Sequence, residues 1–185
     1  SLITTAYIVS IVSEYVVSEY SYKKLKRKKL NQQIKKLNNH VIVCGYGRNG
    51  AQAVKRLKSY NMPCVVIDKG SNALEDTEGE TLYIEGDAID DDILIKAGVK
   101  RASALICALP KDTDNLFIVL SARQLSKDLR IISRASELSS YKKLKIAGAD
   151  NVILPDSIGG QHMASLIVVP DLIDFLDNMT LVEGD

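Results

Sequence analysis

The sequence predicts an α/β fold built on a doubly wound, parallel, six-stranded sheet, and three observations support this prediction. Short apolar runs rich in β-branched residues alternate with helix-forming stretches from residue 41 onward, as strands and crossover helices do in a parallel sheet. The first apolar run ends in a Gly-x-Gly-x-x-Gly motif, and a helix-forming stretch follows at once. The second run ends in Asp68, about 20 residues after the motif.

The predicted elements follow one another regularly, and the six strands fit the order 3-2-1-4-5-6 of a Rossmann-like fold. The predicted strands are 41–44, 64–67, 81–85, 104–108, 130–133 and 151–154. The predicted helices are 49–59, a short one around 72–77, 90–96, 113–125, 139–147 and 157–169. We expect the last helix to end before Pro170, because proline lacks the backbone N–H that a helix interior needs.

An N-terminal helix and a basic linker are predicted before this fold. Residues 2–17 are apolar and are interrupted by Glu14, so the stretch is too short for a complete transmembrane helix, which needs about 18 or more apolar residues. Tyrosines and then lysines follow the stretch, as they do at the cytoplasmic end of a membrane helix. The alternative is an amphipathic helix that packs on the domain or on a partner.

The linker, residues 21–39, is predicted to be an amphipathic helix. Leu30, Ile34 and Leu37 repeat at a helical spacing of four and three residues. The lysines form either a solvated face or a surface attracted to anionic lipid headgroups. A nucleic-acid partner is not expected, because no aromatic or glycine residues alternate with the lysines. The basic residues are Lys23, Lys24, Lys26, Arg27, Lys28, Lys29, Lys35 and Lys36.

The glycine motif predicts a phosphate site where the first strand meets the first helix. Gly45 allows a sharp turn, Gly47 leaves room for a pyrophosphate, and Gly50 lets the helix approach the sheet. The helix start offers unpaired N–H groups and about +0.5 of a charge, and Arg48 adds a cation. A plain strand-to-helix turn is the alternative. Asp68 is expected to bind the ribose hydroxyls, which favours NAD or an adenosine nucleotide over NADP.

Ligands of such a sheet bind at the carboxyl ends of the strands, near the point where the strand order reverses. Asp87 would lie beside an adenine pocket, although it also suits a helix cap or a turn. Arg134 would reach phosphate, or else pair with Glu137 on the surface. The candidate binding residues are Gly45, Tyr46, Gly47, Arg48, Asn49, Gly50, Asp68, Lys69, Asp87, Ala88, Ala108, Leu109 and Arg134.

Composition limits the other possibilities. The chain has 185 residues, 46% of them hydrophobic, and a net charge of +1, which suits one domain with appendages. Its three cysteines, Cys44, Cys64 and Cys107, all fall in predicted strands, so we expect buried thiols in a reducing cytosol and no zinc site. The apolar face of residues 171–176 needs a partner. The chain stops at Asp185, so we expect an excised piece or pairing with a second copy.

Catalysis has little support in the sequence. A Tyr-x-x-x-Lys pattern, which could supply a tyrosine acid beside a lysine, occurs at Tyr22–Lys26 and again at Tyr141–Lys145. Both copies read Tyr-Lys-Lys-Leu-Lys, and we interpret them as solvated helix surface. The sequence shows no Ser/His/Asp set, no metal-ligand cluster and no Gly-Lys-Ser/Thr phosphate loop.

Five stretches of the chain follow the pattern of one known family. They are Lys-Lys-Leu-Asn-Asn at 35–39, His-Val-Ile-Val-Cys-Gly-Tyr-Gly-Arg-Asn-Gly at 40–50, Glu-Gly-Asp-Ala at 85–88, Ala-Gly-Ala-Asp at 147–150 and Ile-Gly-Gly-Gln-His-Met-Ala at 158–164. They resemble the regulator-of-potassium-conductance domains, also called TrkA-N domains, and the resemblance covers nearly the whole chain. It implies a Rossmann domain that binds NAD(H), ATP, ADP or AMP without chemistry, dimerises, and assembles into a higher-order cytoplasmic gating ring that pulls on pore helices.

The resemblance also implies a division of the chain. Residues 1–20 would be the cytoplasmic end of a pore-lining inner helix, 21–39 the linker, 40–155 the nucleotide-binding domain, and 156–185 a crossover helix and dimerisation segment. Two departures stand out: Asn49 replaces a small apolar residue, and the family's smaller C-terminal lobe is missing.

By position, the residues from Gly45 to Gly50 other than Asn49 would hold phosphate, Asp68 would bind ribose, and Asp87 and Ala88 would lie on the adenosine side. The expected function is therefore ligand gating of a potassium channel at the cytoplasmic face of the cell membrane, with the pore domain in the same protein. The alternatives are a small NAD-dependent oxidoreductase and a soluble regulatory subunit of a potassium uptake system.

Overall fold

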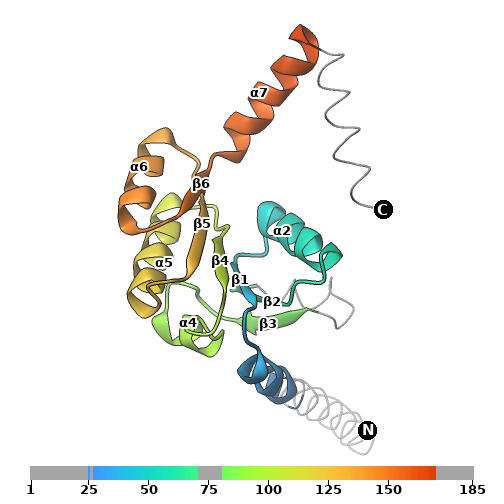
Figure 1. Cartoon of the computed structure of the whole chain (residues 1–185), viewed down its shortest axis with the longest axis vertical. Coiled ribbons are helices and arrows are strands. Elements are labelled where there is room, and N and C mark those ends of the chain that lie inside the picture. Colours follow the sequence, from blue (N-terminus) through green and yellow to red (C-terminus); the bar gives the residue numbers. More distant parts are fainter. Residues whose placement is uncertain (1–24, 26, 71–80, 170–185) are drawn as a thin grey trace, which may run out of the picture.

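The predicted parallel sheet forms the centre of the molecule (Figure 1). A computed structural model describes residues 25, 27–70 and 81–169. Six strands, all parallel, lie in the order β3-β2-β1-β4-β5-β6, which is the predicted order. The strands are β1 Val41–Cys44, β2 Cys64–Asp68, β3 Leu82–Glu85, β4 Ala104–Cys107, β5 Arg130–Arg134 and β6 Asn151–Ile153. The helices are α2 Arg48–Ser59, α4 Asp91–Lys96, α5 Asp112–Leu125, α6 Leu138–Ala147 and α7 Pro155–Val168.

Strand β1 is the central strand, and all four of its residues are buried. A parallel strand covered on both faces needs an uninterrupted apolar sequence, which Val-Ile-Val-Cys provides. Cys44, the last residue of β1, pairs in register with Ile67 of β2 on one side and with Cys107 of β4 on the other. The chain winds to one side after β1 and to the other side after β3, so the reversal of strand order falls between β1 and β4.

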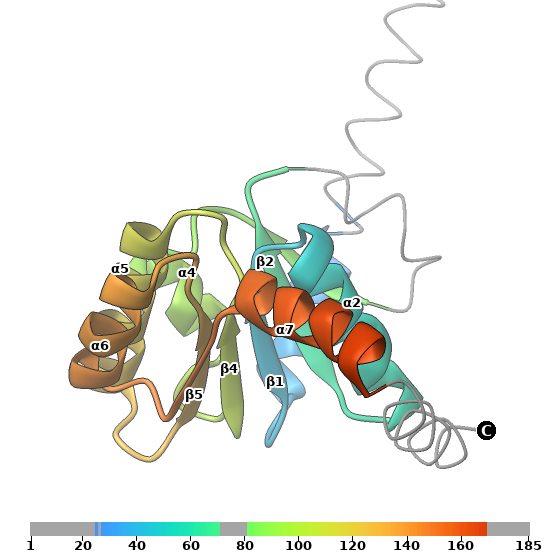
Figure 2. The same ribbon diagram turned by 90° about the horizontal axis from the view of Figure 1, so that it is seen from above.

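Helices cover both faces of the sheet (Figure 2). Val54 of α2 packs with Val43 and Val66 on one face. Side chains from α4, α5 and α6 form the larger core on the other face, where Leu94, Ile118 and Leu144 are fully buried. The three cysteines are buried free thiols, as predicted.

A helix over residues 27–36, here called the linker helix, precedes β1. Ile34 is 1% exposed and belongs to the larger core, and Leu37 packs against that core, as the apolar spacing predicted. Arg101 holds the end of the helix, because its guanidinium donates to the backbone carbonyls of Ile34 (3.3 Å) and Leu37 (3.1 Å). This cap joins residues more than 60 positions apart, so no local sequence pattern indicated it.

Most element boundaries differ from the predicted ones by one or two residues. Helix α7 begins earlier than predicted, at Pro155, because proline suits the first position of a helix. It projects away from the sheet, and none of its residues is buried (Figure 1). The predicted elements at 1–20, 72–77 and 171–176 lie outside the described residues. Within the described ranges, no helix combines the length and the apolar character needed to cross a bilayer.

Candidate functional site

The turn after β1 requires glycine at two positions. Gly45 has a φ of +96°, in the left-handed region that favours glycine, and its N–H donates to the carbonyl of Ile67 at 2.8 Å. A side chain at position 50 would place its Cβ 1.9 Å from the carbonyl oxygen of Gly45. The start of α2 therefore lies directly against the turn, as the motif predicted.

Gly47 leaves the start of α2 open. It is the N-cap of the helix, and no side chain caps the first-turn N–H groups. No atom outside the neighbouring residues lies within 4 Å of the position that a Cβ would occupy. The helix start thus combines unpaired donors and a partial positive charge with free space, which is the arrangement that suits a phosphate.

A hollow of about 280 Å³ lies in front of this helix start. Arg48, Arg134 and Asn49 line the hollow, and the two arginines give it a positive charge. Asp156, at the beginning of α7, is a single opposing carboxylate. The remaining lining residues are Gly47, Ala108 and Pro110.

The guanidinium of Arg134 has a buried hydrogen-bond donor that no described residue satisfies. Its Nη2 donates to the hydroxyl of Ser136 at 2.9 Å, and its Nε is buried without a hydrogen-bond partner among the described residues. The surface ion pair with Glu137, one of the two predicted alternatives, is not formed between these described side chains. An unsatisfied buried donor beside a hollow favours binding of an acceptor group there.

Asp68, at the end of β2, organises the glycine turn. Its carboxylate accepts the N–H of Tyr46 at 2.7 Å and the N–H of Gly70 at 2.7 Å. The first bond joins the glycine turn to β2, a role that the sequence analysis did not foresee. Each carboxylate oxygen keeps a further lone pair, so the group can still accept hydrogen bonds from hydroxyls.

Lys69 and Asp87 form an ion pair of 2.8 Å beside Asp68, between the ends of β2 and β3. The hydrogen bond between them lowers the pKa of Asp87 and raises that of Lys69. Asp87 also accepts the N–H of Ile89 at 3.1 Å, so it is the turn carboxylate that was one of its two predicted alternatives. Ala88 is buried beneath this turn.

Asn115 was not among the residues predicted from sequence, although it positions two of the candidate residues, Leu109 and Arg134. It is fully buried at the start of α5. Its side chain bonds both the N–H and the carbonyl of Leu109 (3.1 and 2.9 Å) and the carbonyl of Arg134 (3.3 Å). It thereby ties the segment after β4 to the end of β5. Its place on the apolar face of its helix, four residues before Val119, was the available indication.

The structure thus brings most of the candidate residues to one edge of the sheet. Gly47, Arg48, Asn49, Ala108 and Arg134 line the hollow, and Asp68 is joined to the same glycine turn through the N–H of Tyr46. Lys69, Asp87 and Ala88 lie beyond Asp68, at the ends of β2 and β3. Donors at the hollow and a carboxylate beside it suit a ligand that carries both phosphate and hydroxyl groups.

Other chemistry has no comparable cluster. In the described part of the chain, no three His, Cys, Asp or Glu side chains are placed to hold a metal ion. The ammonium of Lys145, in the last turn of α6 and part of the second Tyr-x-x-x-Lys pattern, donates to the backbone carbonyl of Asp150, just before β6. That contact is the one expected of a helix-surface lysine.

Residues 41–155 match the family model of the TrkA-N domain, and the chain belongs to that family. Potassium channel protein 1 of Methanocaldococcus jannaschii is 36% identical over 97% of this chain and 55% of its own length. Probable potassium channel protein 2 of the same organism is 37% identical over 97% of this chain and 53% of its own length. The chain therefore spans about half the length of these relatives.

Solved structures share the fold. The TrkA-N domain of the inner membrane protein ybaL from Escherichia coli has a TM-score of 0.68 and 27% identity, over 71% of this chain and 98% of that one. The GsuK channel bound to NAD has a TM-score of 0.58 and 26% identity, over 64% of this chain and 22% of that one. GsuK bound to ADP has a TM-score of 0.58 and 27% identity, over 64% of this chain and 31% of that one.

Proposed function

We propose that this chain is the cytoplasmic nucleotide-binding domain that regulates a potassium channel, and that NAD(H) or an adenine nucleotide is its regulatory ligand. The observation that carries the proposal is the uncapped start of α2 at Gly47, which opens into a hollow lined by Arg48 and Arg134. Two findings agree with it: the similar relatives are named potassium channel proteins, and GsuK has been solved with NAD and with ADP.

In this proposal the diphosphate lies against the N–H groups at the start of α2 and accepts from the Arg134 guanidinium. The ribose hydroxyls donate to Asp68, and the adenosine side lies towards Asp87 and Ala88. The site holds the ligand and leaves it unchanged, so reduced cofactor incubated with the protein should keep its absorbance. Steady consumption of NADH would instead favour the oxidoreductase alternative.

Assembly would involve both ends of the chain. Residues 1–20 would continue into a pore-lining helix of the same protein in the cell membrane, and residues 156–185 would join two copies. The exposed apolar side chains of α7 support the second point, because a projecting helix without buried residues needs a partner. Dimers would then build a gating ring. The exposed apolar residues of α7 are Ile158, Met163, Leu166, Ile167 and Val168.

Calorimetric titration of the chain with NAD, ATP, ADP and AMP tests ligand binding directly. Gly47→Val should weaken binding at least tenfold, because its side chain fills the space in front of the helix start. Gly159→Val makes the same change at an equally open position in α7 and serves as the matched control. Equal affinity in wild type and Gly47→Val would remove the phosphate site from the proposal.

Regulation needs a second measurement, on the full-length protein. Potassium flux through that protein in lipid vesicles should change when nucleotide is added on the domain's side. The change should disappear with Gly47→Val, because a ligand shifts a conformational equilibrium only through its differential affinity for the two states.

A further inference from the structure

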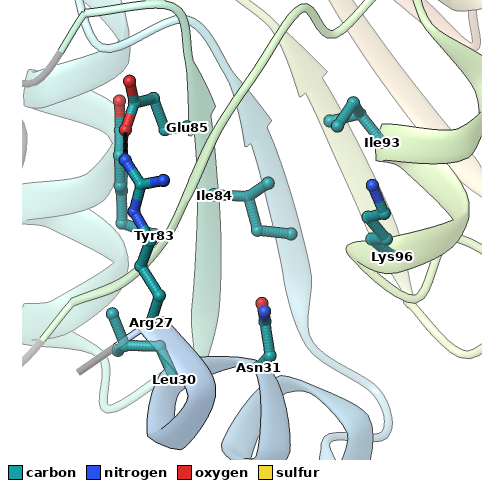
Figure 3. Close-up of a pocket in the computed structure, with 8 residues that line it drawn as sticks. All are labelled: Arg27, Leu30, Asn31, Tyr83, Ile84, Glu85, Ile93 and Lys96. Carbon is teal, nitrogen blue, oxygen red and sulfur yellow. Dashed lines mark hydrogen bonds and ion pairs between the residues drawn. The ribbon is translucent and has the colours of Figure 1, made fainter. Parts of the chain in front are cut away.

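One side chain of the linker helix reaches the end of β3, close to the candidate site. Arg27, on its first turn among the described residues, extends along Tyr83 and forms an ion pair with Glu85, the last residue of β3 (Figure 3). The two partners are 58 residues apart in sequence. A hollow of about 190 Å³ lies between the helix, β3 and α4, with the ion pair along one side.

Glu85 lies beside Asp68, the residue proposed above to bind the ribose hydroxyls. It pairs in register with Asp68, and the next residue, Gly86, donates its N–H to the Asp68 carbonyl at 2.9 Å. The hydroxyl of Tyr83 donates to that same carbonyl at 2.9 Å and also contacts the carbonyl of Gly70. The end of β3 therefore holds the backbone of Asp68, whose carboxylate fixes Tyr46 in the glycine turn.

The opposite end of the linker helix is attached elsewhere. Ile34 lies in the larger core, and Arg101 caps the carbonyls of Ile34 and Leu37. The helix is thus held at two places, and the Arg27–Glu85 ion pair is the attachment on the ligand side. Loss of this pair should release the Arg27 end while the core attachment remains.

We propose that Arg27 is a positioning residue for the nucleotide site: through Glu85 it fixes the end of β3 and Asp68, so that nucleotide binding and docking of the linker helix strengthen each other within one copy of the chain. The inference rests on the function proposed above. It adds a route from ligand to linker that needs no rearrangement between subunits.

Two physical effects make docking of the linker helix and nucleotide binding favour each other. A docked Arg27 holds Glu85, so Asp68 is already in place when the ligand arrives, and less ordering is required on binding. Arg27 also neutralises a carboxylate close to Asp68 and Asp87, which lowers the repulsion felt by a phosphate-bearing ligand. By reciprocity, the ligand stabilises the docked helix by the same factor.

The expected size of the effect is modest. The side chains of Arg27 and Glu85 are 64% and 40% exposed, and exposed ion pairs contribute little. We therefore expect Arg27→Ala to weaken NAD binding by about two- to fivefold. Lys28→Ala removes the same charge from the next residue of the helix, where no ion pair is formed with a described residue, and it is the matched control.

Calorimetry with NAD on the whole chain tests the proposal. Arg27→Ala should weaken binding as stated, Lys28→Ala should leave the affinity within experimental error, and Arg27→Lys should recover most of the loss. The charge exchange Arg27→Glu with Glu85→Arg should restore binding, because it rebuilds the pair with the same net charge. In parallel, amide hydrogen exchange across residues 27–36 should slow on addition of NAD in the wild type and change less in Arg27→Ala.

The outcomes separate this inference from the function on which it rests. Wild-type binding of NAD with equal affinities in Arg27→Ala and Lys28→Ala, or without slower exchange in residues 27–36, overturns the coupling alone. A wild-type chain that binds none of NAD, ATP, ADP and AMP overturns both. Equal weakening by Arg27→Ala and Lys28→Ala shows a general charge effect and overturns the role of the pair.

Discussion

The carbonyl oxygen of Gly45 lies where a side chain at position 50 would begin. The separation from a Cβ built on Gly50 would be 1.9 Å, far inside any allowed contact. The two glycines thus fix how closely α2 approaches the end of β1. Gly47, between them in sequence, faces open space instead, so the three glycines of the motif serve different purposes.

Gly50→Ala should therefore destabilise the domain, whereas Gly47→Ala should not. A methyl group at position 50 must displace the turn or the helix, which we expect to lower the free energy of unfolding by about 1–3 kcal/mol or more. The change at position 47 should stay within about 1 kcal/mol, because nothing lies near the added methyl group. Urea unfolding followed by circular dichroism measures both. Equal destabilisation would show that the helix start does not need the close approach.

Asn115→Ala should destabilise the domain and also weaken nucleotide binding. It leaves the N–H and carbonyl of Leu109 and the carbonyl of Arg134 without their buried partner, at a cost of about 1–3 kcal/mol for each group left unsatisfied. Thr113→Ala, an exposed change in the same helix, is the control. Unfolding and calorimetry on both variants check the prediction, which fails if Asn115→Ala behaves like the control.

Arg134→Ala should weaken binding of NAD by roughly tenfold or more, because a charge-assisted hydrogen bond to phosphate is worth about 1.5–3 kcal/mol. The loss should be similar for ADP, and it should shrink as salt concentration rises, because salt screens the attraction. Arg130→Ala, at the exposed first residue of the same strand, is the control. Unchanged calorimetric affinity in Arg134→Ala would exclude this guanidinium from the phosphate site.

Asp150 should contribute a pH-dependent part of the stability. Partial burial opposes ionisation, but the N–H of Ile131 (2.6 Å) and the Arg123 guanidinium (2.9 Å) lower the pKa of the Asp150 carboxyl below its ordinary value. A carboxyl with a lowered folded-state pKa stabilises the fold above its unfolded pKa of about 3.9 and loses that contribution as the pH falls through the folded value.

Asp150→Asn should accordingly reduce the unfolding free energy at pH 7 by less than about 1 kcal/mol, because the side chain is 46% exposed and solvent screens its charge. The gap from wild type should narrow below about pH 4. Asp128→Asn, at an exposed carboxylate, should show neither effect. Urea titrations at pH 7, 5 and 3 test this. A gap of constant size at all three values would mean that the carboxylate charge is not responsible.

The strand order could be predicted from sequence because buried parallel strands appear as continuous apolar runs, of which Val41–Cys44 is the clearest. The glycine turn and Asp68 could be predicted because each requires a particular residue type at a fixed spacing. In the structure β1 lies between β2 and β4, and no side chain fills the space beside Gly47.

The contacts that support the site could not be predicted, because they join segments that the sequence does not relate. Asp68 and Tyr46 are 22 residues apart, and Arg101 reaches the linker helix across 64 and 67 residues. Asn115 stands on an apolar helix face, but its partners depend on where the ends of β4 and β5 meet. Such pairings follow from packing, and local patterns contain no information about them.

The buried cysteine thiols of the sheet make the chain well suited to site-directed labelling. Burial raises the pKa of Cys44 to about 12, that of Cys107 well above its ordinary value, and that of Cys64 above its ordinary value, so maleimides and nitroxide reagents find little thiolate at any of the three. A single cysteine placed on the solvent side of residues 27–36 would then be the preferred point of attachment, without removal of native sulfur. Probe mobility at that point would report the position of this helix directly.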